Sequence, residues 1–211
     1  MKSHTIYRSV SPAIVLVISA FAVLLAGCAT GSGVRSWVDE RTAVTVNAQK
    51  RAWVFYRDDF QAGVNIYDFA DLGAFEINQA GKRSQYLCLL LWSTVARTPE
   101  HQSKVENDFS TLVVWADDQP LNFKRVTQNH EMLHLGDVAF KRSTANASEG
   151  YYAVSPAQIA ILAGAKTLRI APANQPPGEA PYHTWRDEHG SLVAFSNEIA
   201  GTAKLINSES K

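Results

Sequence analysis

The stretch Phe75-Glu76-Ile77-Asn78, followed by Gln79-Ala80-Gly81-Lys82 and by the apolar run SQYLCLLLWSTV at residues 84–95, decides the fold. Phe75 and Ile77 alternate with polar residues, which is typical of a strand with one buried face. The segment that contains Gly81 has the composition of a tight turn. The sequence therefore predicts an antiparallel hairpin in which residues 84–95 form the returning strand.

The returning strand is apolar on both faces. Tyr86, Cys88, Leu90 and Trp92 share one face, while the leucines between them share the other. A strand of this kind is expected at the centre of a sheet, covered on both sides. It is too short to cross a membrane as a helix, which takes about 20 apolar residues.

Two further strands are predicted before the hairpin. Residues 44–47 and 53–56 each alternate with period two, and we expect them to pair with each other through a turn at residues 47–50. Residues 57–71 carry acids and scattered aromatics and are expected to be mostly irregular. Residues 97–107 are polar and are expected to form a loop.

The second half of the chain repeats the hairpin pattern. Residues 109–116 and 121–123 flank an Asp-Asp-Gln-Pro turn, and residues 183–186 and 192–195 flank Asp187-Glu188-His189-Gly190. Short extended segments are expected at 151–154 and 168–170. Between them, Ser155-Pro156-Ala157-Gln158 has the residues of a capping box and predicts a helix start.

These elements predict the fold class. At least six short strands, hairpin turns, one clear helix and no βαβ alternation favour a mainly β domain, an antiparallel β-sandwich-like body with one or two short helices. A small α+β sheet is the alternative. A single globular β-rich domain is expected over residues 37–206, followed by a polar tail at 207–211.

The N-terminus carries a different signal. Lys2 and Arg8 precede an apolar run from Ala13 to Leu25, and Leu25-Ala26-Gly27-Cys28 follows. This segment resembles the lipobox signal peptide of bacterial lipoproteins. A transmembrane anchor or an ordinary signal peptide is the alternative, but the run is short for spanning a bilayer.

The lipobox resemblance implies processing and location. Cleavage before Cys28 would remove residues 1–27, and the Cys28 thiol and its new amine would carry acyl chains such as palmitate. Residues 28–36 would then be the lipidated cysteine and a flexible tether. Ala29, which is not aspartate, implies sorting to the outer membrane, with the domain on the periplasmic side.

A looser resemblance covers part of the body. The run from Asp71 to Asn78, the Gly81 turn, the strand from Tyr86 to Thr94 and the capped helix at Ser155 are similar to small, uncharacterised proteobacterial lipoproteins. This resemblance implies an envelope location and brings no catalytic residues.

The charge balance of the chain argues against nucleic-acid binding, and its cysteine content argues against a disulfide-stabilised fold. The 20 basic residues less Lys2 and Arg8 leave 18 against 20 acidic ones, a formal charge of −2 for the processed chain. That balance gives no electrostatic basis for binding nucleic acid. With Cys28 lipidated, Cys88 has no partner for an intramolecular disulfide, so the fold must be stabilised by its core.

One motif predicts chemistry. His130-Glu131-Met132-Leu133-His134 matches H-E-x-x-H, in which two histidines on one helix face bind Zn²⁺ and the glutamate acts as general base. Glu149 or His183 would have to complete the site, because the position ten residues after His130, where some zinc peptidases place a third ligand, is Phe140. The competing interpretations are metal binding without catalysis and a solvent-facing turn.

Two functions follow as expectations. The first is a non-enzymatic, lipid-anchored module without a cofactor, which binds an envelope protein through sheet edges or an aromatic patch. The alternative is a zinc-dependent hydrolase or peptidase with Glu131 as base and with His130, His134 and either Glu149 or His183 as ligands.

Overall fold

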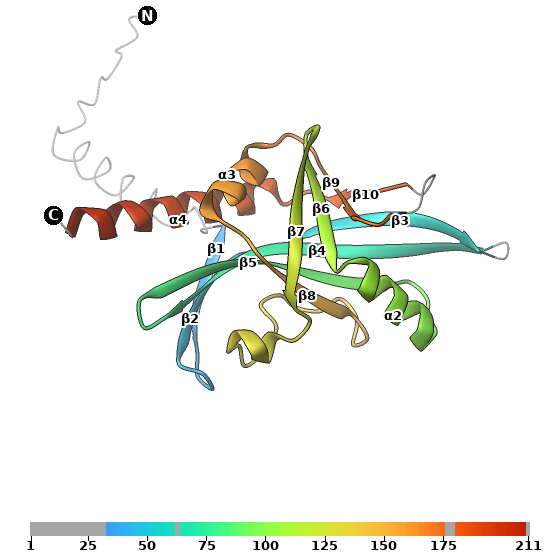
Figure 1. Cartoon of the computed structure of the whole chain (residues 1–211), viewed down its shortest axis with the longest axis horizontal. Coiled ribbons are helices and arrows are strands. Elements are labelled where there is room, and N and C mark those ends of the chain that lie inside the picture. The colour runs from blue at the N-terminus through green and yellow to red at the C-terminus, as the bar shows by residue number, and fades with distance from the viewer. Residues whose placement is uncertain (1–32, 62–63, 176–179, 210–211) are drawn as a thin grey trace, which may run out of the picture. The chain divides into compact units, whose positions relative to one another are not determined.

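The computed structural model describes residues 33–61, 64–175 and 180–209 (Figure 1). The predictions for the signal peptide, for Cys28 and for the first residues of the tether lie outside these described residues. They stay predictions.

Ten strands and three α-helices make up the described chain. The strands are β1 (Val34–Asp39), β2 (Val44–Gln49), β3 (Trp53–Gln61), β4 (Val64–Gln79), β5 (Lys82–Ser93), β6 (Thr111–Ala116), β7 (Gln119–Thr127), β8 (Ser148–Ala153), β9 (Leu168–Pro172) and β10 (Tyr182–Arg186). The helices are α2 (Pro99–Asp108), α3 (Pro156–Gly164) and α4 (His189–Glu209), with a short 3₁₀ helix, η1 (His130–Leu133).

The strands form one antiparallel sheet that closes on itself. Its order runs β1-β2-β4-β3-β10-β9-β6-β7-β8-β5, and β5 pairs in turn with β4. Eight strands from β4 to β5 therefore form a ring, while β1 and β2 extend it alongside residues 75–78 of β4. The prediction of a mainly antiparallel β domain is confirmed.

The central hairpin forms as predicted. β4 and β5 pair continuously from Asp68 opposite Ser93 to Gln79 opposite Lys82. Ala80 and Gly81 connect them with φ of 50° and 86°, the positive values that a tight two-residue hairpin turn requires. β5 also pairs with β8 on its other edge, so it is central in the sheet, as its sequence indicated.

The two apolar faces of β5 pack into two separate cores. Leu87 and Leu89 belong to the cluster enclosed by the ring, together with Phe55 and Phe195. Cys88 and Leu90 belong to the second cluster. Its other members come from β2, the second half of β4, β8 and the segment between η1 and β8: Val44, Val46, Ala48, Phe75, Ile77, Leu135, Ala139, Phe140 and Tyr151.

Gly73 of β4 lies against the ring of Phe140, a member of the second cluster. A Cβ atom at this position would lie 2.3 Å from Cζ of Phe140. The ring of Phe140 therefore rests directly on the strand backbone, and only glycine leaves room for it. This contact packs the segment between η1 and β8 against the outer face of the sheet.

The predicted capping box begins α3. The Ser155 side chain accepts from the backbone of Gln158, and the Gln158 side chain accepts from the backbone of Ser155. Ile159 and Leu162 are buried in the ring cluster, and α3 packs against α4 beside them (Figure 1).

Two segments predicted to lack regular structure are ordered. Within this range, residues 57–61 belong to β3 and residues 64–71 belong to β4, and the two strands pair with each other in the ring. Residues 97–107 were expected to form a loop but lie mostly in α2, which Thr98 caps and Pro99 begins. The sequence of α2 lacks the apolar stripe by which amphipathic helices are recognised. In agreement with this, no residue of α2 is fully buried.

The predicted pairing also differs at two places. β2 and β3 do not pair with each other, because each pairs with a different part of β4. The third hairpin does not form either. Asp187 accepts from the backbone of His189 at 2.7 Å, and α4 begins there. Leu192 and Phe195 are then buried at helical spacing.

The domain boundaries are wider than predicted. β1 begins at Val34, within the predicted tether, and α4 runs to Glu209, into the predicted polar tail. Within the described part of the chain, no helix has both the length and the apolar composition that crossing a bilayer as a helix requires.

Candidate functional site

The HEMLH motif forms a single tight turn and not the α-helix that the zinc interpretation needs. Residues 130–133 are 3₁₀ helical, and Asn129 caps them by accepting from the Glu131 backbone at 2.7 Å. His134 then adopts the left-handed conformation, with φ 58° and ψ 36°. The helical spacing that would direct both imidazoles to one ion is therefore absent from this segment.

His130 contacts a carboxylate that other side chains already hold. Its Nδ1 lies 2.9 Å from Oε1 of Glu149 on β8. The Tyr151 hydroxyl donates to Oε2 of Glu149 at 2.7 Å, and Arg142 lies 3.4 Å from Oε1. This cluster ties the segment that follows η1 to β8, which is a structural role.

The predicted site residues do not assemble into a metal centre. His130 and Glu149 come together, but His183 lies on β10, exposed, and pairs across the sheet with Tyr56 and Arg169. Among residues 33–61, 64–175 and 180–209, no three His, Cys, Asp or Glu side chains are grouped closely enough to hold a metal ion.

Cys88 is enclosed in the second core cluster, as expected for an inert thiol. It is fully buried on β5, and burial raises the pKa of its thiol well above the ordinary value. A thiol in this state has almost no thiolate at neutral pH, so Cys88 is not a nucleophile.

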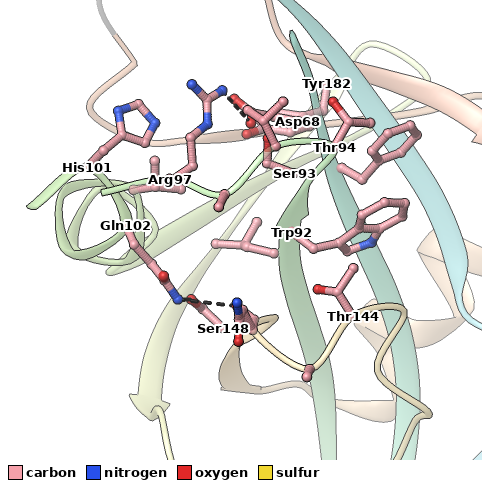
Figure 2. Close-up of a pocket in the computed structure, with 17 residues that line it drawn as sticks. Asp68, Trp92, Ser93, Thr94, Arg97, His101, Gln102, Thr144, Ser148 and Tyr182 are labelled. Carbon is pink, nitrogen blue, oxygen red and sulfur yellow. Dashed lines mark hydrogen bonds and ion pairs between the residues drawn. The ribbon is translucent and has the colours of Figure 1, made fainter. Parts of the chain in front are cut away.

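The described structure holds a cavity at the end of β5, beneath α2 (Figure 2). Its volume is about 240 Å³. Two stretches of chain supply most of its wall: residues 91–97, which follow the buried part of β5, and residues 144–146 with Ser148, at the start of β8. His101, Gln102 and Val105 of α2 line it from a third side, and Asp68, Phe69 and Tyr182 complete it.

A buried ion pair closes one end of this cavity. Arg97 lies 2.8 Å from Oδ1 of Asp68, whose side chain is 9% exposed, and Arg57 lies 3.6 Å from Oδ2. The Arg57 guanidinium also lies 4.8 Å from the ring centre of Tyr182. These contacts join Arg97, in the segment between β5 and α2, to β4, and removing the arginine would be costly because it would leave a buried carboxylate with less compensating charge.

A hydrogen-bond chain closes the other end. Gln102 donates to Oγ of Ser148 at 2.9 Å and to the backbone oxygen of Asn146 at 3.3 Å. The Ser148 hydroxyl donates in turn to Glu106 at 2.5 Å. These polar contacts join α2 to the start of β8 and to the residues just before it.

An aromatic wall continues from the cavity onto the outer face of the sheet. Trp92 stacks on Phe69 with ring centres 4.2 Å apart, and the exposed Trp185 approaches Phe69 edge-on at 6.1 Å. The Trp92 indole donates to Oδ1 of Asp71 at 3.1 Å. Burial raises the pKa of Asp71, while its hydrogen bonds from Trp92 and Ser143 act in the opposite direction.

His101 stands out among the cavity residues. Its Nε2 atom is buried, and no described residue forms a hydrogen bond with it. A buried ring nitrogen without a protein partner requires a polar atom from water or from a ligand. Figure 2 shows the His101 and Gln102 side chains on one side of the cavity, with Trp92 and Thr144 across from them.

Sequence reasoning did not identify this cavity. The residues that form it are individually ordinary, and they meet only because β5, α2 and β8 converge. The one local signal was Thr98-Pro99-Glu100, a helix start that would have placed α2 after the hairpin.

Comparisons with protein-family models, with curated proteins and with solved structures found no match to this chain.

Proposed function

We propose that the chain is a lipid-anchored envelope protein whose domain binds a partner and does not catalyse a reaction. The anchor is the Cys28 motif, which would join an acylated cysteine to a domain whose first strand begins at Val34. Several acyl chains on one residue give stable membrane attachment, whereas one gives only marginal binding. We place the anchor in the outer membrane, with the domain on the periplasmic side.

The observation that carries the binding role is the cavity beneath α2. It combines apolar lining, such as Leu91 and Val105, with convergent polar groups at both ends, which is the composition of a recognition site. Sequence reasoning had expected binding through sheet edges or an aromatic patch. The closed ring pairs both edges of most strands, so the sheet offers few edges and the cavity is the stronger candidate.

The conformation of the HEMLH segment does not favour the alternative zinc hydrolase. The 3₁₀ turn at His130, the left-handed His134 and the engagement of Glu149 with Tyr151 and Arg142 leave the motif in a structural role.

Photocrosslinking in cells tests the proposal on the full chain. Val95 lines the cavity and is 42% exposed, so a benzophenone amino acid at this position would contact a bound partner. The matched control carries the same amino acid at Lys124, an exposed residue of β7 that does not line the cavity. A third arm combines the Val95 probe with Cys28→Ser.

We expect one discrete adduct from the Val95 probe, absent from the Lys124 probe and lost with Cys28→Ser because the protein no longer reaches the membrane. Equal labelling from both positions, or no adduct from Val95, would contradict the binding role. An adduct that persists with Cys28→Ser would contradict the anchor alone.

A further inference from the structure

The cavity exists because β5 runs past the end of its neighbour β8. β8 begins at Ser148, which pairs with Leu91. On its other edge β5 continues, with Trp92 opposite Phe69 and Ser93 opposite Asp68. Among the described strands, none pairs with β5 beyond Leu91 on the β8 side, and the cavity lies at that open edge.

Two backbone hydrogen bonds show which groups face the open edge. Thr94 donates to the backbone oxygen of Tyr67 on β4 at 3.0 Å, so even-numbered residues here face β4. The oxygen of Gln85 accepts from Val154 at 3.1 Å, so odd-numbered residues face the β8 side. Because the direction alternates along a strand, the N–H and C=O of Ser93 point to the open edge.

The cavity beside this edge is smaller than a typical small-molecule site. Its volume of about 240 Å³ is below the range of roughly 300–1,000 Å³ that holds drug-sized ligands. Leu91, Val105 and Tyr182 give it an apolar part. The buried Nε2 of His101 adds a polar atom that needs a partner.

We propose that this cavity binds a short peptide segment in extended conformation, with its main chain paired to the open edge of β5 at Ser93 and one apolar side chain in the cavity. Strand addition of this kind draws affinity from main-chain hydrogen bonds and specificity from a side-chain pocket. The inference rests on the proposed binding role and is independent of the lipid anchor.

The direct test is an NMR titration of the isotope-labelled full chain in detergent micelles. The probe is a blocked pentapeptide with leucine at its centre and serine and threonine on either side. One control peptide replaces the leucine with glycine, and a second carries an N-methyl group on the leucine nitrogen. The first control removes the apolar side chain and the second removes one main-chain donor.

We expect saturable shifts at the amides of Leu91, Ser93 and His101, with a Kd on the order of 1 mM or below for the leucine peptide. The glycine peptide should bind about 10-fold to 100-fold more weakly, because the apolar burial is lost. The N-methylated peptide should also bind more weakly. Equal binding of all three peptides, or shifts that map elsewhere, would overturn the proposal.

A protein variant gives an independent test. Val105→Trp fills the cavity from α2 and should abolish peptide binding, whereas Lys104→Trp places the same side chain on the exposed side of the helix and should leave binding unchanged. Peptide binding that survives in a folded Val105→Trp protein would overturn the proposal. If that variant does not fold, the comparison of the three peptides decides alone.

Two outcomes separate this inference from the proposed function. Saturable binding of N-acetylglucosamine at the same amides, without a response to peptide, would make the cavity a saccharide site and overturn the peptide assignment. A Val95 crosslink in cells, together with no amide shifts on addition of peptide, would contradict the peptide inference but would still support the binding role.

Discussion

The contact between Gly73 and Phe140 gives the sharpest stability prediction, because it explains how the segment carrying the HEMLH motif is held. Gly73→Ala would place a Cβ atom 2.3 Å from the buried ring of Phe140. A contact this short forces the ring or the strand to move, and overpacking of this type costs about 1–3 kcal/mol. We expect the substitution to lower the free energy of unfolding by that amount.

A double-mutant cycle identifies the cause. Phe140→Ala alone should cost about 3–5 kcal/mol, because it leaves a cavity in the second core cluster. In the Phe140→Ala background the new methyl group at Gly73 meets no ring, so adding Gly73→Ala should cost almost nothing. The two substitutions should therefore show a coupling energy of about 1–3 kcal/mol.

Denaturant unfolding followed by tryptophan fluorescence measures all four proteins. Gly164→Ala is the matched control, because a Cβ atom there meets nothing within 4 Å. It should be neutral or stabilising by up to about 1 kcal/mol in its helix. A Gly73→Ala protein as stable as the parent, or additive costs in the cycle, would refute the packing described for the η1–β8 connection.

Three further predictions follow from particular side chains. Ser155→Ala should cost about 1 kcal/mol of unfolding free energy, measured in denaturant, because it removes the N-cap bonded to Gln158. Burial raises the pKa of Asp71, so the parent protein should gain stability relative to Asp71→Asn as pH falls from 7 toward the unfolded pKa of about 4; a constant difference across that range would contradict this. Cys88 should react with a thiol reagent only at the rate of global unfolding, and rapid labelling of the native protein would show that β5 is not covered as described.

Local signals in the sequence were reliable where a few neighbouring residues set the conformation. The turn at Gly81 and the capping box at Ser155 each form within a few residues, and both appear as predicted. The two-faced apolar pattern of β5 also correctly placed that strand between two covered faces.

The sequence of α4 contains a helical pattern, but a stronger turn-like pattern precedes it. Leu192, Phe195 and Ile199 have helical spacing, but the Asp187-Glu188-His189-Gly190 tetrad resembles a hairpin turn. Asp187 in fact accepts from the Trp53 indole at 2.6 Å as well as from His189. This long-range contact commits Asp187 to a capping position, and no local pattern contains it.

The ring and the cavity depend on contacts between distant residues. β10 has little apolar character, yet it closes the ring by pairing with β3 and β9. The cavity follows from the difference in length between β5 and β8, a matter of long-range register. The HEMLH segment matches a catalytic pattern in sequence but forms a 3₁₀ turn, in which His130 contacts Glu149 of β8.

The intact mass of the protein extracted from bacterial membranes, measured beside a Cys28→Ser variant, tests the lipid anchor. We expect a chain that begins at Cys28 and carries a diacylglyceryl group and a third acyl chain, with neither modification in the variant. A mass that retains residues 1–27, or an unmodified cysteine at the N-terminus, would contradict it.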